Sequence, residues 1–389
     1  MNQRVLKLRL YPDDCHLPIL NKHIGHNRFV YNECVKLNKK LYEETGKIKN
    51  RFELSSYIKQ LKDTDKPWLK EVNTQSLQQT ILNYSRAMSN YLQYLKHLSK
   101  GKKPKRNIGE PKIKRKNIVG AGSFRVPQHG RLMVDDINPK YKSHIIFPKI
   151  KKPIRIHYHR ILPLDAIIGA MIITKDNVGD WWVYIEYKTN ESYKVVKTGN
   201  RIIGIDVGVA NYYTTSDGKV VKNPKFFEEE VDKLRKLNRL ISKKRNNKVG
   251  TKRLQLKQNK LYIKIHNKTL DFIHKETNKL IRENQSISIE SLSVSDLLIM
   301  NDSNLSRRIQ YSNLFQFLNI LKYKCQWSGT ELRTVDRFFA SSKICSNCGN
   351  KDDTITLKDR TYNCKHCGHS IDRDLNAAIN IRDNSKQIK

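Results

Sequence analysis

Two pairs of cysteines near the C-terminus constrain this chain more than any other feature of its sequence. Cys345 and Cys348 form one Cys-x-x-Cys motif, Cys364 and Cys367 form a second, and fifteen residues separate the two. Four thiolates at this spacing are typical of a closed tetrahedral zinc site, which has a structural role. The other three of the seven cysteines are isolated. We therefore expect a zinc ribbon in a reducing compartment, and no disulfide framework.

The charge of the chain points to nucleic acid. Lys and Arg total 75 against 37 Asp and Glu, which gives a net charge of +38 over 389 residues. Such an excess predicts a polyanionic partner bound in a salt-dependent way. A merely basic protein, or one drawn to anionic membrane, is the simpler alternative, but the excess runs through most of the chain. No stretch approaches the roughly 20 apolar residues of a membrane span. We expect a cytoplasmic, nucleoid-associated protein.

The first hundred residues combine one strand with helices. Residues 4–11 alternate apolar and basic side chains, which predicts a strand ended by Pro12. Helical periodicity follows from about 13 to 98, and Thr74 is a plausible N-cap for its last helix. The polar face of that helix carries Gln75 and Gln79. These side chains are either solvated or able to reach base edges, because Gln pairs well with adenine.

A basic linker follows over residues 100–116, with nine basic residues, one acid, and interrupting Gly and Pro. Its charge predicts that it lies along phosphates. The candidate nucleic-acid-binding residues here are Lys102, Lys103, Lys105, Arg106, Lys112, Lys114, Arg115 and Lys116.

The next region is rich in β-branched and alternating residues, which indicate strands. We expect these strands at residues 123–126, 132–134, 144–147, 154–158, 167–174 and 181–187. They predict a small barrel or sandwich. The N-terminal strand is expected to join it, which would make residues 13–100 a helical insertion.

A new unit begins near residue 201. A short buried strand ends in Asp206, and a hairpin with an Asp-Gly turn at Asp217 follows it. The pattern then predicts helices at 227–245 and 252–284, a strand at 286–292 that contains Glu290, a helix at 307–328, a strand at 331–339, and a short helix beginning near Asp374. This order matches an RNase H-like layout, in which such acids converge.

Three acids in this layout suggest a metal-dependent nuclease. Two Mg²⁺ ions roughly 3.5–4 Å apart, held by carboxylates, can support phosphodiester hydrolysis. Each acid also has a simpler explanation: Asp206 as a turn residue, Glu290 as a solvent-facing strand residue, and Asp374 as a helix N-cap. Asp372 competes with Asp374 for either role. The occurrence of all three acids in this order indicates a nuclease more strongly than any one of them does alone.

Several motifs make the chain recognisable. They are Arg9-Leu-Tyr-Pro12, Arg28-Phe-Val-Tyr31-Asn32, Gly204-Ile-Asp206-Val-Gly208, Ile-Ser-Ile-Glu290-Ser-Leu, Val335-Asp336-Arg337, Ser341-Ser-Lys343-Ile-Cys345-Ser-Asn-Cys348-Gly349 and Asp372-Arg-Asp374-Leu-Asn376-Ala-Ala. Together they resemble the TnpB family of transposon-encoded RNA-guided DNA endonucleases, which is related to the compact type V CRISPR effectors. The resemblance touches nearly the whole chain and is most specific from residue 200 onward.

The resemblance implies an α/β multidomain protein with one Mg²⁺-dependent RuvC-like (RNase H-like) nuclease site. By motif position, Asp206, Glu290 and Asp374 would be its catalytic acids, and the four cysteines would hold structural Zn²⁺. The nuclease domain would comprise 196–340 and 371–389, with the zinc ribbon at 341–370. A β-barrel wedge domain would comprise 1–12 and 105–195, and a helical recognition domain 13–104.

The resemblance also implies the partners. A guide RNA from the transposon end would direct cleavage of double-stranded target DNA beside a short transposon-adjacent motif, and Gln75 and Gln79 are our candidates for reading that motif. We expect no membrane partner and favour a monomer. The alternatives are a nuclease-inactive RNA-guided repressor, which the three intact acids disfavour, an RNA-independent resolvase or transposase, and a type V CRISPR effector.

Overall fold

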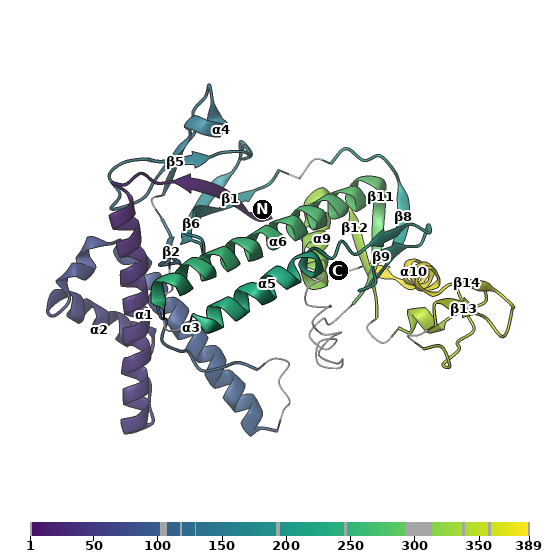
Figure 1. The fold of residues 1–389 in the computed structure, drawn as a ribbon, viewed down its shortest axis with the longest axis horizontal. Coiled ribbons are helices and arrows are strands. Elements are labelled where there is room, and N and C mark those ends of the chain that lie inside the picture. Colours follow the sequence, from purple (N-terminus) through teal and green to yellow (C-terminus); the bar gives the residue numbers. More distant parts are fainter. Residues whose placement is uncertain are drawn as a thin grey trace. The chain divides into compact units, whose positions relative to one another are not determined.

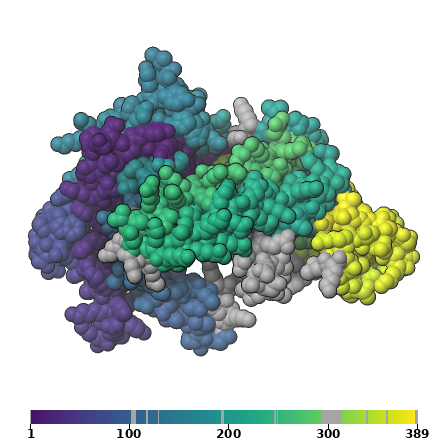
Figure 2. All heavy atoms as spheres, in the orientation of Figure 1, coloured from purple at the N-terminus to yellow at the C-terminus, as the bar shows by residue number. Residues whose placement is uncertain are grey.

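The chain folds into two compact units, Met1–Glu191 and Ser192–Lys389. The computed structural model describes residues 2–101, 107–116, 119–128, 130–191, 195–244, 247–291, 313–336, 339–356 and 359–387. Over those ranges, no helix combines the length and apolar character needed to cross a membrane. Figure 1 shows the order of the elements along the chain, and Figure 2 shows the C-terminal residues, in yellow, gathered in one place.

A seven-stranded antiparallel sheet forms the first part of unit 1. Its strand order is β2-β6-β7-β1-β5-β4-β3. The strands are β1 (Asn2–Tyr11), β2 (Gly122–Val126), β3 (Arg131–Met133), β4 (His144–Ile146), β5 (Ile154–His157), β6 (Ile167–Lys175) and β7 (Trp181–Thr189), with a short helix α4 (Pro139–Lys142) before β4. The N-terminal strand lies between β7 and β5. Its alternation buries Leu6, Leu8 and Leu10 in the core of the sheet.

Each strand of this sheet pairs only with its neighbours in that order, so β2 and β3 are the two edge strands. Each predicted strand of the region is found within two residues of its expected bounds. Closure of the row into a barrel stays a prediction, because the hydrogen bonds of the described strands join neighbours in the row only.

Helices fill the chain between β1 and β2. They are α1 (Leu17–Thr45), α2 (Arg51–Asp63), the 3-10 helix η1 (Pro67–Glu71) and α3 (Thr74–Ser99). Their apolar faces form a second core, in which Val30 of α1, Leu54 of α2 and Tyr84 of α3 are completely buried. The expected N-cap was wrong by one residue: the Asn73 side chain accepts a hydrogen bond from the Ser76 backbone N–H, and Thr74 is the first residue of the helix.

Unit 2 is built on a six-stranded mixed sheet with the order β10-β9-β8-β11-β12-β15. Its strands are β8 (Arg201–Val207), β9 (Asn211–Thr215), β10 (Val220–Lys222), β11 (Asn284–Glu290), β12 (Glu331–Val335) and β15 (Lys386–Gln387). β8, β11 and β12 are parallel, while β9 and β10 form an antiparallel hairpin whose turn has Gly218 at φ +84°. This arrangement confirms the predicted RNase H-like fold.

The helices of unit 2 are α5 (Phe226–Lys243), α6 (Lys248–Glu283), α9 (Leu314–Ser328) and α10 (Arg373–Asn384). α5 and α6 run side by side (Figure 1). Ile273 of α6 and Phe317 of α9 are buried completely in the core, against the side chains of β8, β9 and β11. The first part of the expected helix 307–328 lies outside the described residues, and α9 is described from Leu314 onward. The strand β12 ends at Val335, earlier than expected.

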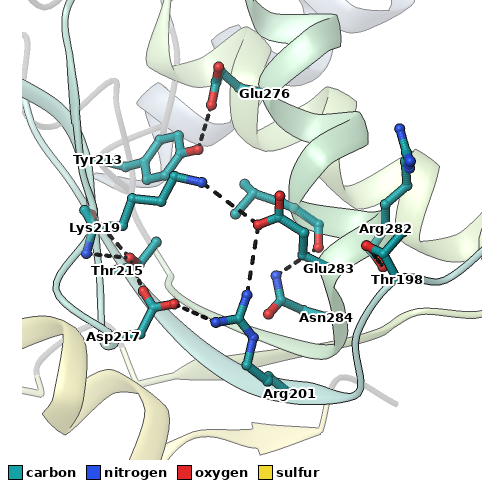
Figure 3. A network of polar contacts seen from close by, with 11 residues as sticks. Thr198, Arg201, Tyr213, Thr215, Asp217, Lys219, Glu276, Arg282, Glu283 and Asn284 are labelled. Atoms are coloured by element: carbon teal, nitrogen blue, oxygen red, sulfur yellow. Dashed lines mark hydrogen bonds and ion pairs between the residues drawn. The ribbon is translucent and has the colours of Figure 1, made fainter.

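A network of charged side chains holds the C-terminal end of α6 to the strand ends beside it (Figure 3). Arg201 pairs with Asp217 at 2.9 Å and approaches Glu283 at 3.8 Å. Lys219 also approaches Glu283, and Tyr213 donates a hydrogen bond to Glu276 at 2.7 Å. The network lies at the amino ends of β8 and β11, where it holds the C-terminal end of α6 in place. The carboxyl ends of these strands lie at the opposite edge of the sheet.

Candidate active site and metal centre

The carboxyl ends of two parallel strands carry the first two predicted acids. Asp206 lies one residue before the end of β8, and Glu290 is the last residue of β11. The strands are direct neighbours, with Ile205 opposite Ile289. Carboxyl ends of parallel strands meet at one edge of a sheet, where α/β proteins commonly bind ligands. The register therefore brings Asp206 and Glu290 to the same edge.

The third acid arrives on α10, which packs directly against β8. A Cβ atom added at Gly204 would lie 2.0 Å from the carbonyl oxygen of Ala378 and 2.7 Å from the backbone nitrogen of Arg382. Both Ala377 and Ala378 are buried. Only a residue without a side chain permits this approach, which holds the middle and the later part of α10 against the strand that bears Asp206.

Asp372 and Asp374 have different positions at the start of this helix. Asp372 is the N-cap, and its carboxylate accepts hydrogen bonds from the backbone N–H groups of Asp374 at 2.9 Å and Leu375 at 3.0 Å. The carboxylate of Asp374 is contacted instead by Asn211 at 3.4 Å and by Arg373 at 3.3 Å. The capping role therefore belongs to Asp372, which leaves Asp374 available to a ligand.

The three acids interact electrostatically. Burial raises the pKa of Asp206 well above its usual value, and the charges of Glu290 and Asp374 raise it further, against the opposing charge of Arg373. Burial also raises the pKa of Glu290, and a hydrogen bond from Ser341 opposes that shift. Negative charge gathered in a poorly solvated place is stabilised by a cation. Oxygen ligands suit a hard divalent ion such as Mg²⁺. Among the described residues, however, the ligand atoms of the three acids are not gathered as closely as those of a metal cluster.

Ser341 is a site residue that sequence reasoning did not single out. Its hydroxyl donates to the Glu290 carboxylate, and its carbonyl accepts a hydrogen bond from the Asn380 side chain at 2.8 Å. Asn376, also on α10, donates to the carbonyl of Ile344 at 2.7 Å. Both asparagines are buried. The serine stands inside a recognised motif, but its pairing with Glu290 has no local sequence signal because 51 residues separate them.

The four cysteines come together as the spacing predicts. Their sulfur atoms all lie within 4.8 Å of one another, and no other group of acidic, His or Cys side chains in the described ranges forms such a cluster. The Sγ atoms of Cys345 and Cys367 are 3.8 Å apart, and those of Cys348 and Cys364 are 3.6 Å apart. Sulfurs at 2.3 Å from a tetrahedral zinc ion would be about 3.8 Å apart. The cluster fits Zn²⁺.

The two halves of this cluster repeat one backbone pattern. Gly349 and Gly368 follow the second cysteine of each motif with φ of +75° and +72°, and each donates its N–H to the carbonyl of the first cysteine. Left-handed backbone favours glycine, which explains the residue in both places. The strands β13 (Thr361–Asn363) and β14 (Ser370–Asp372) flank the second motif, and the 3-10 helix η2 (Ser341–Lys343) precedes the first.

A polar groove of about 540 Å³ lies within unit 1 between α1, α3 and β2. Gln79 and Asn83 of α3 line it and contact each other at 3.2 Å. Its basic lining residues are Arg28, Arg86, Lys114, Arg115 and Arg125. Gln75 is not among the lining residues, and it donates instead to Gln128 at 3.3 Å. Two of the predicted linker residues and one of the two predicted glutamines therefore share one concave surface.

The basic segment beside this groove is held on α1. The Asn32 side chain donates to the carbonyl of Lys114 at 3.0 Å and accepts from its backbone N–H at 2.8 Å. The Lys114 ammonium lies 3.8 Å from the centre of the Tyr31 ring, and burial lowers its pKa. By exposed surface, Lys114 and its neighbours Lys112 and Lys116 are all exposed. The predicted residues Lys102, Lys103, Lys105 and Arg106 lie outside the described residues.

Comparisons with known proteins find similarity along most of the chain. Three protein-family models match: the "Helix-turn-helix domain" of OrfB_IS605 over residues 1–47, the "Probable transposase" OrfB_IS605 over 184–300, and the "Cas12f1-like, TNB domain" over 315–381. The last match includes all four cysteines and Asp374.

Three curated relatives align with nearly the whole chain. A "Putative RNA-guided DNA endonuclease" of Streptomyces pristinaespiralis is 28% identical over 97% of this chain and 88% of its own length. A protein of the same description from Escherichia coli K12 is 25% identical over 97% of this chain and 91% of its length. A "TnpB-like protein" of Acanthamoeba polyphaga mimivirus is 25% identical over 96% and 72%. With the motifs and the RNase H-like sheet, these matches agree with the resemblance of the chain to the TnpB family.

Proposed function

We propose that this chain is an RNA-guided DNA endonuclease that cleaves double-stranded DNA at one RuvC-like site. The observation that carries the proposal is the interaction of Asp206, Glu290 and Asp374, which come from two parallel strand ends and one helix start. The descriptions of the relatives from S. pristinaespiralis and E. coli support the same activity. Guide pairing would read the target sequence, and the protein would read only a short adjacent motif.

The three acids would hold two Mg²⁺ ions, which supply an activated water and neutralise the charge that develops on the phosphate. Ser341 would keep the Glu290 carboxylate in place, and Asn211 with Arg373 would do the same for Asp374. Because burial and mutual repulsion raise the pKa of Asp206, this carboxyl group gains the most from a bound cation. The four cysteines would hold a structural Zn²⁺ with no open position, outside the reaction.

The groove in unit 1 is our candidate for the surface that reads the adjacent motif. Gln79 and Asn83 carry amides that can pair with base edges, and Arg28, Arg86 and Arg115 can neutralise phosphates beside them. Gln75 stays a weaker candidate, since its amide is engaged with Gln128. Lys112, Lys114 and Lys116 would bind phosphates along the held basic segment, together with Lys102, Lys103, Lys105 and Arg106 of the same linker.

The division of labour we propose follows the chain. Residues 1–12 and 105–195 would form the wedge domain, 13–104 the recognition domain, 196–340 and 371–389 the nuclease domain, and 341–370 the zinc ribbon. The protein would act as a monomer on the chromosome, in the cytoplasm.

The test combines RNA identification with cleavage. The protein is purified after expression with its native flanking DNA, its bound RNA is sequenced, and plasmids that carry the matching target are incubated with Mg²⁺. We expect a discrete RNA from the transposon end and guide-dependent cutting. Asp206→Asn should abolish cutting and retain guide-dependent binding, whereas Asp271→Asn, a change at an exposed acid of α6, should leave cutting intact.

Other results would favour the alternatives. Cutting of bare DNA without enriched RNA would indicate the RNA-independent resolvase or transposase. Guided binding by the wild-type protein without any cutting would indicate the repressor. Cys348→Ser should release zinc and lower stability, and unchanged zinc content in that variant would overturn the ribbon assignment.

A further inference from the structure

One side of helix α10 carries three buried polar side chains at the spacing of a single helix face. They are Arg373, Asn376 and Asn380, and they keep 9%, 0% and 4% of their surface. Burying polar groups costs free energy unless their hydrogen bonds are made. The partners of these three lie mainly in the segment 341–370, which carries the four cysteines. We call the three side chains the ribbon clamp.

The clamp holds the first cysteine motif by its backbone. The Asn376 side chain donates to the carbonyl of Ile344 at 2.7 Å and accepts the N–H of Ser346 at 2.9 Å. The Asn380 side chain donates to the same Ile344 carbonyl at 2.6 Å. Ile344 and Ser346 are the two chain neighbours of Cys345. Each of these hydrogen bonds therefore ends at a backbone group next to an expected zinc ligand.

The segment between the two cysteine motifs holds the first turn of α10. Arg373 donates one N–H to the carbonyl of Thr356 at 2.9 Å and another to the Asp374 carboxylate at 3.3 Å. Its backbone N–H donates to the carbonyl of Arg360 at 2.9 Å. The strand β14 runs directly into the helix, because its last residue, Asp372, is also the N-cap. One guanidinium thus joins the ribbon to a predicted catalytic acid.

The clamp also reaches a second acid. The Asn380 side chain donates to the carbonyl of Ser341 at 2.8 Å, and the hydroxyl of Ser341 donates to the Glu290 carboxylate. Asp374 and Glu290 are therefore both connected to the ribbon through α10. Asp206 differs, because it lies inside β8 and its backbone position is set by pairing within the sheet.

The ribbon has little core of its own to hold this arrangement. Among the described residues, its buried cluster comprises Cys345, Tyr362 and Cys364, with Ile355 and Ile371 packed beside them. Two of the three buried members are expected zinc ligands. A unit this small depends on its metal for a fixed conformation. Metal binding should therefore determine the backbone conformation that the clamp contacts.

We propose that the zinc-bound ribbon positions Asp374 and Glu290 through the clamp, an inference that rests on the proposed function. The three clamp side chains would act as positioning residues, and none of them needs to touch the substrate. The metal would take no part in the reaction. The fixed backbone of the ribbon would dock α10, and the docked helix would carry Asp374 to the active site.

A ribbon that served only to contact nucleic acid would behave differently when altered. Its exposed cations, such as Lys351 and Lys365, can reach phosphates, but the clamp is buried and cannot. Loss of an exposed cation lowers the affinity for DNA or RNA. Loss of the clamp should instead lower the rate at which an assembled complex cuts its target.

The first experiment follows the coupling without any cleavage. Hydrogen exchange, measured by mass spectrometry, compares the wild-type protein–RNA complex before and after removal of zinc by a chelator, without Mg²⁺ or target DNA. Metal analysis confirms the removal. We expect faster exchange over residues 373–381, because α10 loses its docking surface, and unchanged exchange in α1 and α5. Equal protection of α10 in the two samples would overturn the inference.

The second experiment measures cutting and zinc binding in Asn376→Asp. This change keeps the size of the side chain but removes its donor to Ile344. We expect single-turnover cutting to slow by about 5- to 30-fold, with unchanged affinity for guide RNA and target DNA. Zinc affinity should fall as well, because coupling between two sites is reciprocal.

The control makes the same change of charge elsewhere in unit 2. Asn267→Asp, at an exposed position of α6, should leave the cutting rate, the nucleic-acid affinities and the zinc affinity unchanged. If Asn376→Asp also retains the wild-type cutting rate and zinc affinity, the inference is wrong.

Variants of Arg373 separate position from charge. Arg373→Lys keeps a cation beside Asp374 but lacks the planar fork that joins the Thr356 carbonyl to the Asp374 carboxylate. The inference predicts slow cutting in both Arg373→Lys and Arg373→Gln. Cutting at the wild-type rate by Arg373→Lys would show that this residue acts on Asp374 by its charge alone.

The failure of this inference is distinguishable from failure of the proposed function. If the wild-type complex does not cut, the proposed function fails, and the exchange experiment still tests the coupling. If the wild type cuts and zinc removal changes target affinity alone, only the positioning role fails. A melting curve for each variant checks that unit 2 stays folded at the assay temperature.

Discussion

At the scale of single residues, His23 illustrates how the fold selects a protonation state. Its Nδ1–H donates to the carbonyl of Ile19 at 2.8 Å, and its Nε2 accepts the backbone N–H of Asn73 at 3.1 Å. The ring also stacks on Phe124. Only the neutral ring can donate at one nitrogen and accept at the other. Burial accordingly lowers the pKa of His23 to about 4.

The stability of unit 1 should therefore fall with acid in a defined window. An unfolded histidine takes up its proton near pH 6.5, but the folded one does so only near pH 4, so the unfolded state binds more protons between these values. Stability is lost as pH falls through that window, by about 2 kcal/mol at pH 5. Hydrogen exchange of the α1 and α3 peptides at pH 7 and pH 5 measures the loss. His23→Gln should remove most of the dependence and exposed His97→Gln should retain it; equal behaviour of the two variants would contradict the assignment.

Ser341 provides a second prediction at this scale, about catalysis. Its hydroxyl is the donor that opposes the raised pKa of Glu290. Ser341→Ala should lower the rate of DNA cutting by about 10-fold, because a hydrogen bond to a charged group is lost. RNA binding should be unchanged. The acidic limb of the pH–rate profile should move to higher pH, since Glu290 would lose the contact that favours its ionised form.

The adjacent serine is the control for this change. Ser342→Ala should leave both the rate and the pH profile as in the wild type. If the two variants behave alike, Ser341 has no specific role at Glu290.

At the scale of elements, the contact between β8 and α10 decides where Asp374 lies. Gly204→Ala would place a Cβ atom 2.0 Å from a backbone oxygen of α10, which cannot be relieved by turning a side chain. The helix must move off the strand. We expect cutting to be lost and unit 2 to be destabilised by about 3 kcal/mol, which lowers its melting temperature by roughly 6–12 °C.

A glycine with open space around it provides the control. Gly25→Ala in α1 meets no atom within 4 Å and should preserve cutting and raise stability slightly. Both variants are compared by calorimetry and by cleavage of the matched plasmid. A fully active Gly204→Ala protein would mean that the close packing of α10 on β8 is not required for the site.

The elements themselves were largely predictable, but their contacts were not. Alternation located β1 and the strands from β2 to β7 because a half-buried strand repeats every two residues. The same pattern says nothing about order, and the position of β1 between β7 and β5 depends on contacts across more than 140 residues. The cysteine cluster was predictable because its ligands lie within 23 residues. The hydrogen bonds between Ser341 and Glu290 and between Asn32 and Lys114 join segments that are distant in the sequence. No periodicity of the sequence predicts such contacts.

The choice between neighbouring residues was also beyond the sequence pattern. Asp372 and Asp374 are both suitable for an N-cap, and only the backbone conformation at Asp372 decides between them. Likewise, Gln75 and Gln79 lie on one polar helix face, yet only Gln79 lines the groove. In both cases the residue type was right, and the position along one helix determined which of the two residues reaches the site.

At the scale of the whole molecule, the net charge of +38 predicts opposite responses of the free protein and its complex to salt. In the free protein the cations repel one another, so screening should raise the melting temperature as NaCl increases from 50 to 200 mM. In the complex the same screening reduces counterion release, and RNA affinity should fall by about 1,000-fold or more if six or more phosphates are contacted. Thermal melting and filter binding over one salt series test both. A melting temperature that falls with salt would indicate that ion pairs such as those of Figure 3, rather than repulsion between uncompensated cations, dominate the electrostatics of the free chain.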